Sequence, residues 1–196
     1  MSDFVIKNVR VAFVKVFTPE EYQQGDGRPR YSITSLVVPG SENDKLIRAK
    51  IDEAGKETYG AKWPQMHQSF KGQSSKYCYL DGASQPYEGF EGMLSLSAHR
   101  QGKHGRPIII DRDMSALAEA DGRPYGGCYC NVKVSIYVQK SPNPGVRASF
   151  SVVQFVKDGD AFSGARPSLD GMADLSDGAD ADAFGEDYEN SAVGLV

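Results

Sequence analysis

The chain has 196 residues, and its 22 Lys and Arg stand against 26 Asp and Glu, for a formal net charge of −4. This length suits one domain of about 150 residues plus a tail, and no run of about 18 apolar residues predicts a membrane-spanning helix. Three cysteines, an odd number, argue against a disulfide framework and favour a reducing cytoplasm.

The charge is divided between two blocks. Residues 1–157 hold 21 basic and 16 acidic residues, whereas residues 158–196 hold ten acidic residues and one arginine. A basic body with an acidic tail is typical of proteins that bind nucleic acid or a membrane surface. The plain alternative is an ordinary domain with a solubility tail.

Two strands are predicted at the start of the chain. Residues 4–17 alternate in the manner of a long strand that places Val5, Val9, Val11 and Phe13 on one face. A turn rich in Gly then leads to a β-branched strand at residues 31–38. Both segments favour a β-rich fold.

One helix is predicted at residues 41–60. Ser41 has the position of an N-cap, Asp44 that of the N3 acid of a capping box, and Gly60 ends the helix. Its apolar spacing indicates core packing rather than chemistry. Residues 61–92 show no regular pattern and predict a long irregular loop, of the kind that is usually functional or mobile.

The second half of the chain predicts four strands, with one or two helical turns at residues 113–120. The strands cover residues 93–100, 108–110, 128–138 and 146–157. In residues 128–138 an apolar face alternates with a polar and aromatic face. From about residue 164 the chain is rich in Gly, Asp and Ala, which predicts disorder.

These elements predict a mainly β fold. Because βαβ alternation is absent, we expect antiparallel pairing. An OB-type Greek-key barrel with one helix and a disordered acidic C-terminal tail fits best, and a β-sandwich is the alternative. The expected boundaries are residues 1–163 for the barrel and 164–196 for the tail.

Enzyme signatures are absent from the sequence, which contains no nucleotide-binding P-loop, nucleophile elbow or zinc-protease motif. A zinc site at Cys128 and Cys130 would need two further ligands, such as Cys78 and one of His67, His99 or His104. Their strand spacing instead favours a role as small core residues. Asp111 and Asp113 are read as a strand end rather than a metal pair. We therefore expect no catalytic residue, metal or cofactor.

Aromatic rings beside Lys and Arg are typical of proteins that bind single-stranded nucleic acid, because bases stack on the rings while cations contact phosphates. Tyr129, Lys133 and Tyr137 share one strand face, and Arg147 lies on the expected partner strand. Each loop aromatic has the alternative role of plugging a barrel end. The full set of candidates is Arg28, Arg30, Trp63, Phe70, Lys71, Lys76, Tyr77, Tyr79, Lys103, Arg106, Tyr129, Lys133, Tyr137 and Arg147.

Three segments carry a resemblance to a known family. Residues 125–137 and 153–162, together with the opening strand at residues 8–13, resemble a phage family of single-stranded-DNA-binding proteins, long a domain of unknown function. That resemblance implies an OB fold and an acidic tail that competes with DNA. It also implies DNA replication or recombination in the cytoplasm of an infected bacterium, with single-stranded DNA as partner.

The resemblance leaves the tail's own partner open. Phage or host replication proteins are candidates, although the chain ends in Gly194-Leu195-Val196 rather than on the aromatic residue characteristic of bacterial single-strand binders. One alternative function is a protein-interaction or virion component whose tail docks a basic partner. Another is a metal-dependent nuclease or recombinase.

Overall fold

A computed structural model describes residues 3–21 and 27–162 of the chain. The predicted acidic tail at residues 164–196 lies outside the described residues, so the expected boundary at residue 163 stays a prediction. The described residues comprise nearly all of the basic body.

The strands of the body form one seven-stranded sheet. They are β1 (Phe4–Glu20), β2 (Arg30–Val37), β3 (Tyr79–Asp81), β4 (Leu94–Gln101), β5 (Ile108–Ile110), β6 (Tyr129–Gln139) and β7 (Gly145–Lys157). Their order is β3-β4-β2-β1-β6-β7-β5, and only β5 and β7 pair in parallel. The six predicted strands are therefore confirmed, and the short β3 is an addition.

The sheet closes into a barrel through the segment that precedes β3. Cys78 N–H donates to the Val146 carbonyl of β7 at 3.1 Å, and Ser97 N–H of β4 donates to the Cys78 carbonyl at 2.9 Å. Gly145 is required beside this contact, because a Cβ there would lie 2.4 Å from the Lys76 carbonyl oxygen. The ring β1-β2-β4-β7-β6 therefore rules out the open β-sandwich.

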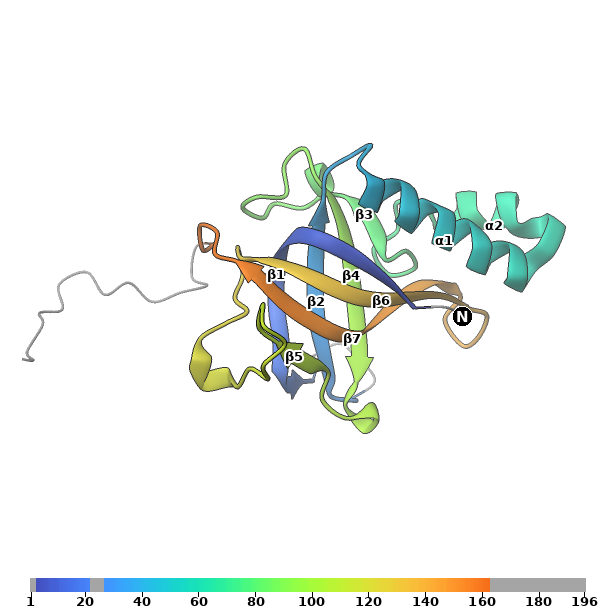
Figure 1. Cartoon of the computed structure of the whole chain (residues 1–196). Coiled ribbons are helices and arrows are strands. Elements are labelled where there is room, and N and C mark those ends of the chain that lie inside the picture. Colours follow the sequence, from blue (N-terminus) through green and yellow to red (C-terminus); the bar gives the residue numbers. More distant parts are fainter. Residues whose placement is uncertain (1–2, 22–26, 163–196) are drawn as a thin grey trace, which may run out of the picture. The chain divides into compact units, whose positions relative to one another are not determined.

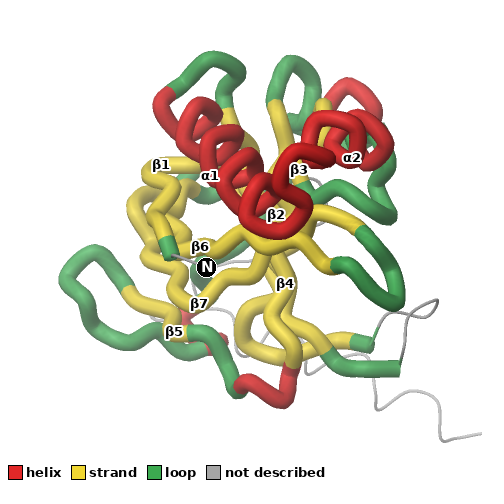
Figure 2. The backbone as a smooth tube through the Cα atoms, turned by 90° about the vertical axis from the view of Figure 1, so that its right-hand side faces the viewer, coloured by secondary structure: helices red, strands yellow, loops and turns green. Residues whose placement is uncertain are grey.

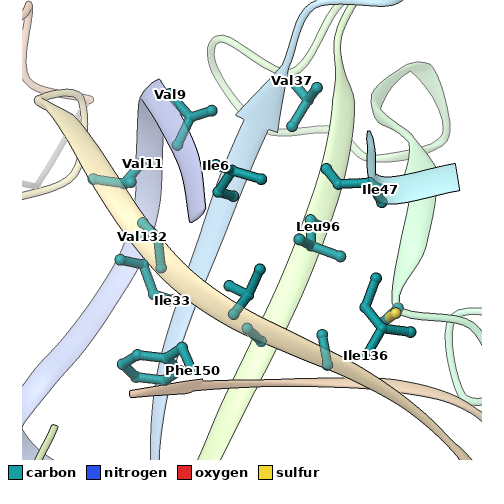
Figure 3. Packing of buried hydrophobic residues seen from close by; sticks show 14 of the residues in the cluster. Ile6, Val9, Val11, Ile33, Val37, Ile47, Leu96, Val132, Ile136 and Phe150 are labelled. Carbon is teal, nitrogen blue, oxygen red and sulfur yellow. The ribbon is translucent and has the colours of Figure 1, made fainter. Parts of the chain in front are cut away.

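Side chains that point into the ring form the core. Figure 3 shows Ile6, Ile33, Leu96, Val132 and Phe150, from β1, β2, β4, β6 and β7, pointing toward one another. All five are almost fully buried. The alternation of β6 is confirmed, since its apolar positions face this core.

Two irregularities in β1 change the face that its side chains occupy. Asn8 and Phe13 have φ near +50°, and the pairing register shifts at both places. As a result Val9 and Val11 are buried, whereas Val5 and Phe13 are exposed. The predicted common face for these four residues is wrong, because each bulge reverses the alternation.

The predicted helix is present as α1 (Glu42–Tyr59). Ser41 Oγ accepts a hydrogen bond from Asp44 N–H at 3.3 Å, and Gly60, with φ of +54°, ends the helix. The Asp44 carboxylate accepts from Gly40 N–H at 2.8 Å, one residue before the position that a capping box would use. The capping residues are confirmed, with this one change of partner.

A second helix, α2 (Trp63–Phe70), occupies part of the segment that the sequence predicted as irregular. Trp63 is 2 % exposed, and its Nε1–H donates to Asp52 Oδ1 of α1 at 3.0 Å. The ring packs directly on Gly55, where a Cβ would lie 2.1 Å from the nearest ring atom. Packing of Trp63 on α1 therefore stabilises α2, a helix that the pattern of its eight residues does not predict.

The predicted helical turns at residues 113–120 are largely wrong. Only η4 (Glu119–Asp121) is helical there, as one 3₁₀ turn. Leu117 N–H instead donates to the Ile109 carbonyl at 2.9 Å, so this segment covers the outer edge of β5. The other 3₁₀ turns are η1 (Gly60–Lys62), η2 (Gly82–Ser84) and η3 (Gly102–His104).

The helices and the basic turn after β4 lie at opposite ends of the barrel. Figures 1 and 2 both show α1 and α2 together at the upper end, while β4 runs down to the turn at residues 102–104. The outer faces of the strands connect these two ends. Those faces carry the candidate binding residues.

Candidate nucleic-acid interface

The outer face of the β6–β7 hairpin presents polar and aromatic side chains in cross-strand pairs. Tyr129 lies opposite Lys157, whose Nζ is 4.6 Å from the centroid of the ring. Near the other end of the hairpin, Tyr137 lies opposite Arg147. The strand alternation thus brings Tyr129, Tyr137 and Arg147 onto one face together with Lys157, a cation that is missing from the residues predicted from the sequence.

The hydrogen bonds of Arg147 go to neutral partners. Its guanidinium donates to the Ser75 carbonyl at 2.7 Å and to the Asn143 carbonyl at 3.4 Å. Burial raises the pKa of the neighbouring Tyr137, so its phenol stays neutral. Arg147 can therefore contact a phosphate, and the Tyr137 ring can contact a base.

Lys133 has a more apolar setting than the sequence indicated. It lies between Val5 of β1 and Val152 of β7 in the sheet register, and its Nζ is 3.7 Å from the Asp3 carboxylate. Ile108 of β5 continues the same row on the other side of Val152. Of the predicted cations on this hairpin, Lys133 is therefore the one whose charge is partly offset.

Two segments that carry four predicted cations meet at the end of the barrel away from the helices. Gly102 N–H donates to the Pro29 carbonyl at 2.8 Å, which joins the loop before β2 to the turn after β4. This contact brings together the stretches that carry Arg28, Arg30, Lys103 and Arg106. Arg106 stacks 5.8 Å from the ring of Phe17. In the sequence these cations belong to separate loops, and in the fold the two loops lie side by side.

His99 links this basic end to Arg147. It lies on β4 opposite Ser32, and Arg30 is the next outward residue of β2. Burial lowers the pKa of His99, and the charges of Arg30 and Arg147 lower it further. His99 is missing from the binding residues predicted from the sequence, although its outward position after Ser95 and Ser97 was a usable signal.

Four predicted aromatic residues do not belong to an accessible surface. Each is 5 % exposed or less, because α2 and β3 fold them against the end of the barrel: Trp63, Phe70, Tyr77 and Tyr79. His67 Nε2 lies 2.8 Å from Tyr77 Oη, and Tyr79 Oη donates to Asp44 Oδ1 at 3.0 Å. A base cannot stack on a ring that is covered in this way, so their prediction as binding residues is corrected to a structural role.

The two cations predicted beside these rings remain at the surface. Lys71 is exposed directly after α2, and Lys76 is half-buried. The Lys76 carbonyl accepts from Val146 N–H at 2.8 Å, so Lys76 lies next to the strand residue that precedes Arg147. Lys76 can therefore extend the basic surface from Arg147 toward the helices.

Metal chemistry finds no support in the described residues. The Sγ atoms of Cys128 and Cys130 lie 3.7 Å apart inside the core, as their spacing predicted. Within residues 3–21 and 27–162 no group of three or more His, Cys, Asp or Glu is placed to hold a metal ion. Asp111 forms an ion pair with Arg123 at 2.8 Å.

No helix within residues 3–21 and 27–162 is long and apolar enough to cross a membrane.

Solved structures share this fold. The single-stranded DNA-binding protein of bacteriophage Enc34, in complex with ssDNA, superposes with a TM-score of 0.67 at 23 % identity, over 81 % of this chain and 88 % of that chain. The gp2.5 single-stranded DNA binding protein of bacteriophage T7 superposes with a TM-score of 0.56 at 11 % identity, over 89 % and 98 %. These similarities confirm the predicted OB-type barrel.

Sequence comparison gives the family. Protein p50 of Acyrthosiphon pisum secondary endosymbiont phage 1 is 38 % identical over 179 residues, which are 87 % of this chain and 92 % of that protein. Residues 2–184 match the family described as Enterobacter phage Enc34, ssDNA-binding protein. This chain therefore belongs to the family of the phage Enc34 ssDNA-binding protein.

Proposed function

We propose that this protein binds single-stranded DNA without sequence preference and acts in phage DNA replication or recombination. The observation that supports this most directly is the alignment of Arg30, His99 and Arg147 on adjacent outer strand faces of an OB-type barrel. OB folds bind oligonucleotides on the faces of their second and third strands and on the loops beside them. Here those strands are β2 and β4.

The basic surface supplies phosphate contacts along one direction. Arg28, Lys103 and Arg106 lie at its far end, and Lys76 lies beyond Arg147 toward the helices. Guanidinium and ammonium groups placed along a line can follow a sugar–phosphate backbone and release its counterions. Because these cations contact phosphates rather than bases, the binding does not depend on the base sequence.

Tyrosine rings of the hairpin supply stacking. Tyr137 borders Arg147, so a base attached to a phosphate at Arg147 lies within reach of its ring. Tyr129 is already covered on one side by the Lys157 ammonium. We therefore assign the larger stacking contribution on the hairpin to Tyr137, at about 1–3 kcal/mol per base.

The acidic residues of the tail compete with DNA in this proposal. Ten of the 26 acidic residues follow residue 157. Tethered carboxylates reach an effective concentration on the order of millimolar near a site on the same chain. They can therefore occupy the same Lys and Arg that contact phosphates, and DNA must displace them.

Binding of labelled oligonucleotides tests the proposed function. Fluorescence anisotropy with single-stranded and duplex DNA of equal length, over a series of salt concentrations, should give tighter binding of the single strand. The logarithm of the affinity should fall linearly with the logarithm of salt concentration. Equal affinity for both forms at moderate salt, or an affinity that ignores salt, would overturn the proposal.

A further inference from the structure

Phe13 is held outward from β1 in a backbone conformation that a bulky residue seldom adopts. Its φ is +49°, and its side chain is 48 % exposed although its neighbour Ala12 is buried. The register of β1 against β2 shifts between Ala12 and Lys15 to make this possible. A conformation of this kind persists where the surrounding structure enforces it, and such sites often serve function.

A second exposed ring meets Phe13 from a distant part of the chain. Tyr87, in the segment between η2 and β4, is 51 % exposed, and its ring centroid lies 4.8 Å from that of Phe13 at an interplanar angle of 79°. Phe90 is buried beneath both rings, at 5.9 Å and 5.5 Å. The edge-to-face geometry leaves ring surface open to a third flat group.

An open hollow of about 390 Å³ lies beside this pair. Its lining includes Tyr87 itself, Pro86, Gln85 and Glu91. Gln85 Nε2 donates to Ser95 Oγ of β4 at 2.7 Å, which anchors one wall of the hollow to the barrel. The hollow thus mixes one aromatic ring with polar groups, the composition that suits a small planar ligand with polar edges.

The pair lies on the same outer face as the basic residues. Ala12, next to Phe13, is opposite Thr34 of β2, and Thr34 Oγ1 lies 3.4 Å from Ser97 Oγ of β4. Thr34 and Arg30 are four positions apart along β2, a distance of about 13 Å. A single strand that places phosphates at Arg30 can therefore bring a nearby base to Phe13.

Arg10, three residues before Phe13 on β1, is already engaged by other groups. Arg10 donates to the Gly127 carbonyl at 3.1 Å and to the Asp160 carbonyl at 2.7 Å, and its guanidinium stacks 4.3 Å from the ring of Phe162. The region therefore offers stacking with little charge. It complements the basic end of the face, which offers charge with little exposed ring surface.

We propose that Phe13 and Tyr87 form a platform on which one nucleobase of single-stranded DNA stacks, with its polar edge toward the hollow of Gln85 and Glu91. This inference rests on the proposed function and adds a second anchoring point to it. A strand held at both points is fixed by phosphates at one end and by a base at the other.

The test compares thymine oligonucleotides with oligonucleotides of the same length that are abasic throughout. The variant is Phe13→Leu with Tyr87→Leu, which keeps apolar volume and removes both rings. Its matched control is Val38→Ala, which alters an exposed apolar side chain directly after β2. The double variant should bind the thymine strand about five- to 150-fold more weakly than the wild type, the loss expected for one stacked base.

Two further results identify the loss as stacking. The slope of the salt dependence should not change, because no phosphate contact is removed. On a strand that is abasic throughout, wild type and double variant should bind alike. The control variant should match the wild type on both strands. If the melting temperature of the double variant is lowered, the same comparison is made with the single variant Tyr87→Leu, because Tyr87 lies outside the strands.

The outcomes separate this inference from the proposed function. If the wild type fails to bind single strands, the proposed function falls and the platform falls with it. If the wild type binds and the double variant binds equally well, only the platform is overturned. Equal weakening on thymine and abasic strands, or a changed oligomeric state in sedimentation, would also overturn it and assign the rings to folding or to a protein contact.

Discussion

His99 lies between two arginines on the candidate face, and we expect its protonation to make DNA binding depend on pH. Burial and then the charges of Arg30 and Arg147 lower its pKa from the ordinary 6.5. Phosphates bound at these arginines offset their charge and raise that pKa again, so the complex takes up a proton. DNA affinity should therefore rise as the pH falls below about 6.5. Anisotropy titrations at a series of pH values measure this rise.

His99→Gln is the control for that prediction, since it removes the titrating ring and keeps a polar side chain. The pH-dependent gain in affinity should shrink in this variant, and an identical gain would show that another group carries it.

The stability of the folded protein should change in the direction opposite to DNA affinity as the pH falls. The folded pKa values of His67 and His99 are lowered, so the unfolded chain takes up protons first and the free energy of unfolding falls as pH drops below 6.5. Melts at each pH keep the two effects apart.

At the scale of elements, α1 and α2 depend on one close contact. Gly55→Ala would place a Cβ 2.1 Å from the Trp63 ring, and overpacking of this kind costs typically about 1–3 kcal/mol. Urea unfolding should show that loss in the free energy of unfolding. Ala49→Gly, at an exposed position of α1, is the control. It should lower the free energy of unfolding by about 1 kcal/mol, the difference in helix propensity between Ala and Gly. A Gly55→Ala variant as stable as the wild type would contradict the packing.

The same contact explains why α2 was missed in the sequence. Eight residues are too few for a helix that is stable by propensity alone, and its position is set by Trp63 against a helix residue 11 positions earlier. The strands were predictable because alternating apolar and polar residues show directly which side chains of a strand face the core. Where β1 bulges, at Asn8 and Phe13, the alternation fails, and no local residue pattern announces the shift.

The candidate face was predictable in part. Tyr137 and Arg147 meet as expected, because strand period and hairpin pairing fix both. The loop cations come together only through the contact of Gly102 with Pro29, which sequence spacing does not reveal. The buried tyrosines were misassigned because a loop aromatic looks the same in sequence whether it stacks on a ligand or plugs the barrel end.

At the scale of the whole molecule, the charge split is the main feature. Deletion of the tail from Gly171 removes seven acidic residues, Asp174, Asp177, Asp180, Asp182, Glu186, Asp187 and Glu189. If they compete with phosphates, the truncated protein should bind single-stranded DNA more tightly and associate faster at low salt. The gain should shrink as salt rises, since the Debye length is about 8 Å at 0.15 M. Stopped-flow and equilibrium titrations measure both.

A tail in which these acids are replaced by Asn and Gln is the control for chain length. It should behave like the deletion if charge is responsible. Unchanged or weaker binding by both variants at low salt would show that the tail does not compete with DNA, and would leave it a role in partner docking or in solubility. The family to which the chain belongs, that of the phage Enc34 ssDNA-binding protein, agrees with the resemblance that the sequence carries.

In the proposed complex, single-stranded DNA binds across Arg30 and Arg147. The most direct measurement compares the salt dependence of the wild type with that of Arg30→Gln combined with Arg147→Gln. The control combines Lys45→Gln with Lys56→Gln, which removes the same charge from the exposed side of α1. The first variant should lose about 1.4 from the slope of log affinity against log salt and bind at least about tenfold more weakly at low salt. Melts of both variants show whether each is folded at the temperature of the titration. The control should keep nearly the full slope, and equal losses in the two variants would contradict binding across Arg30 and Arg147.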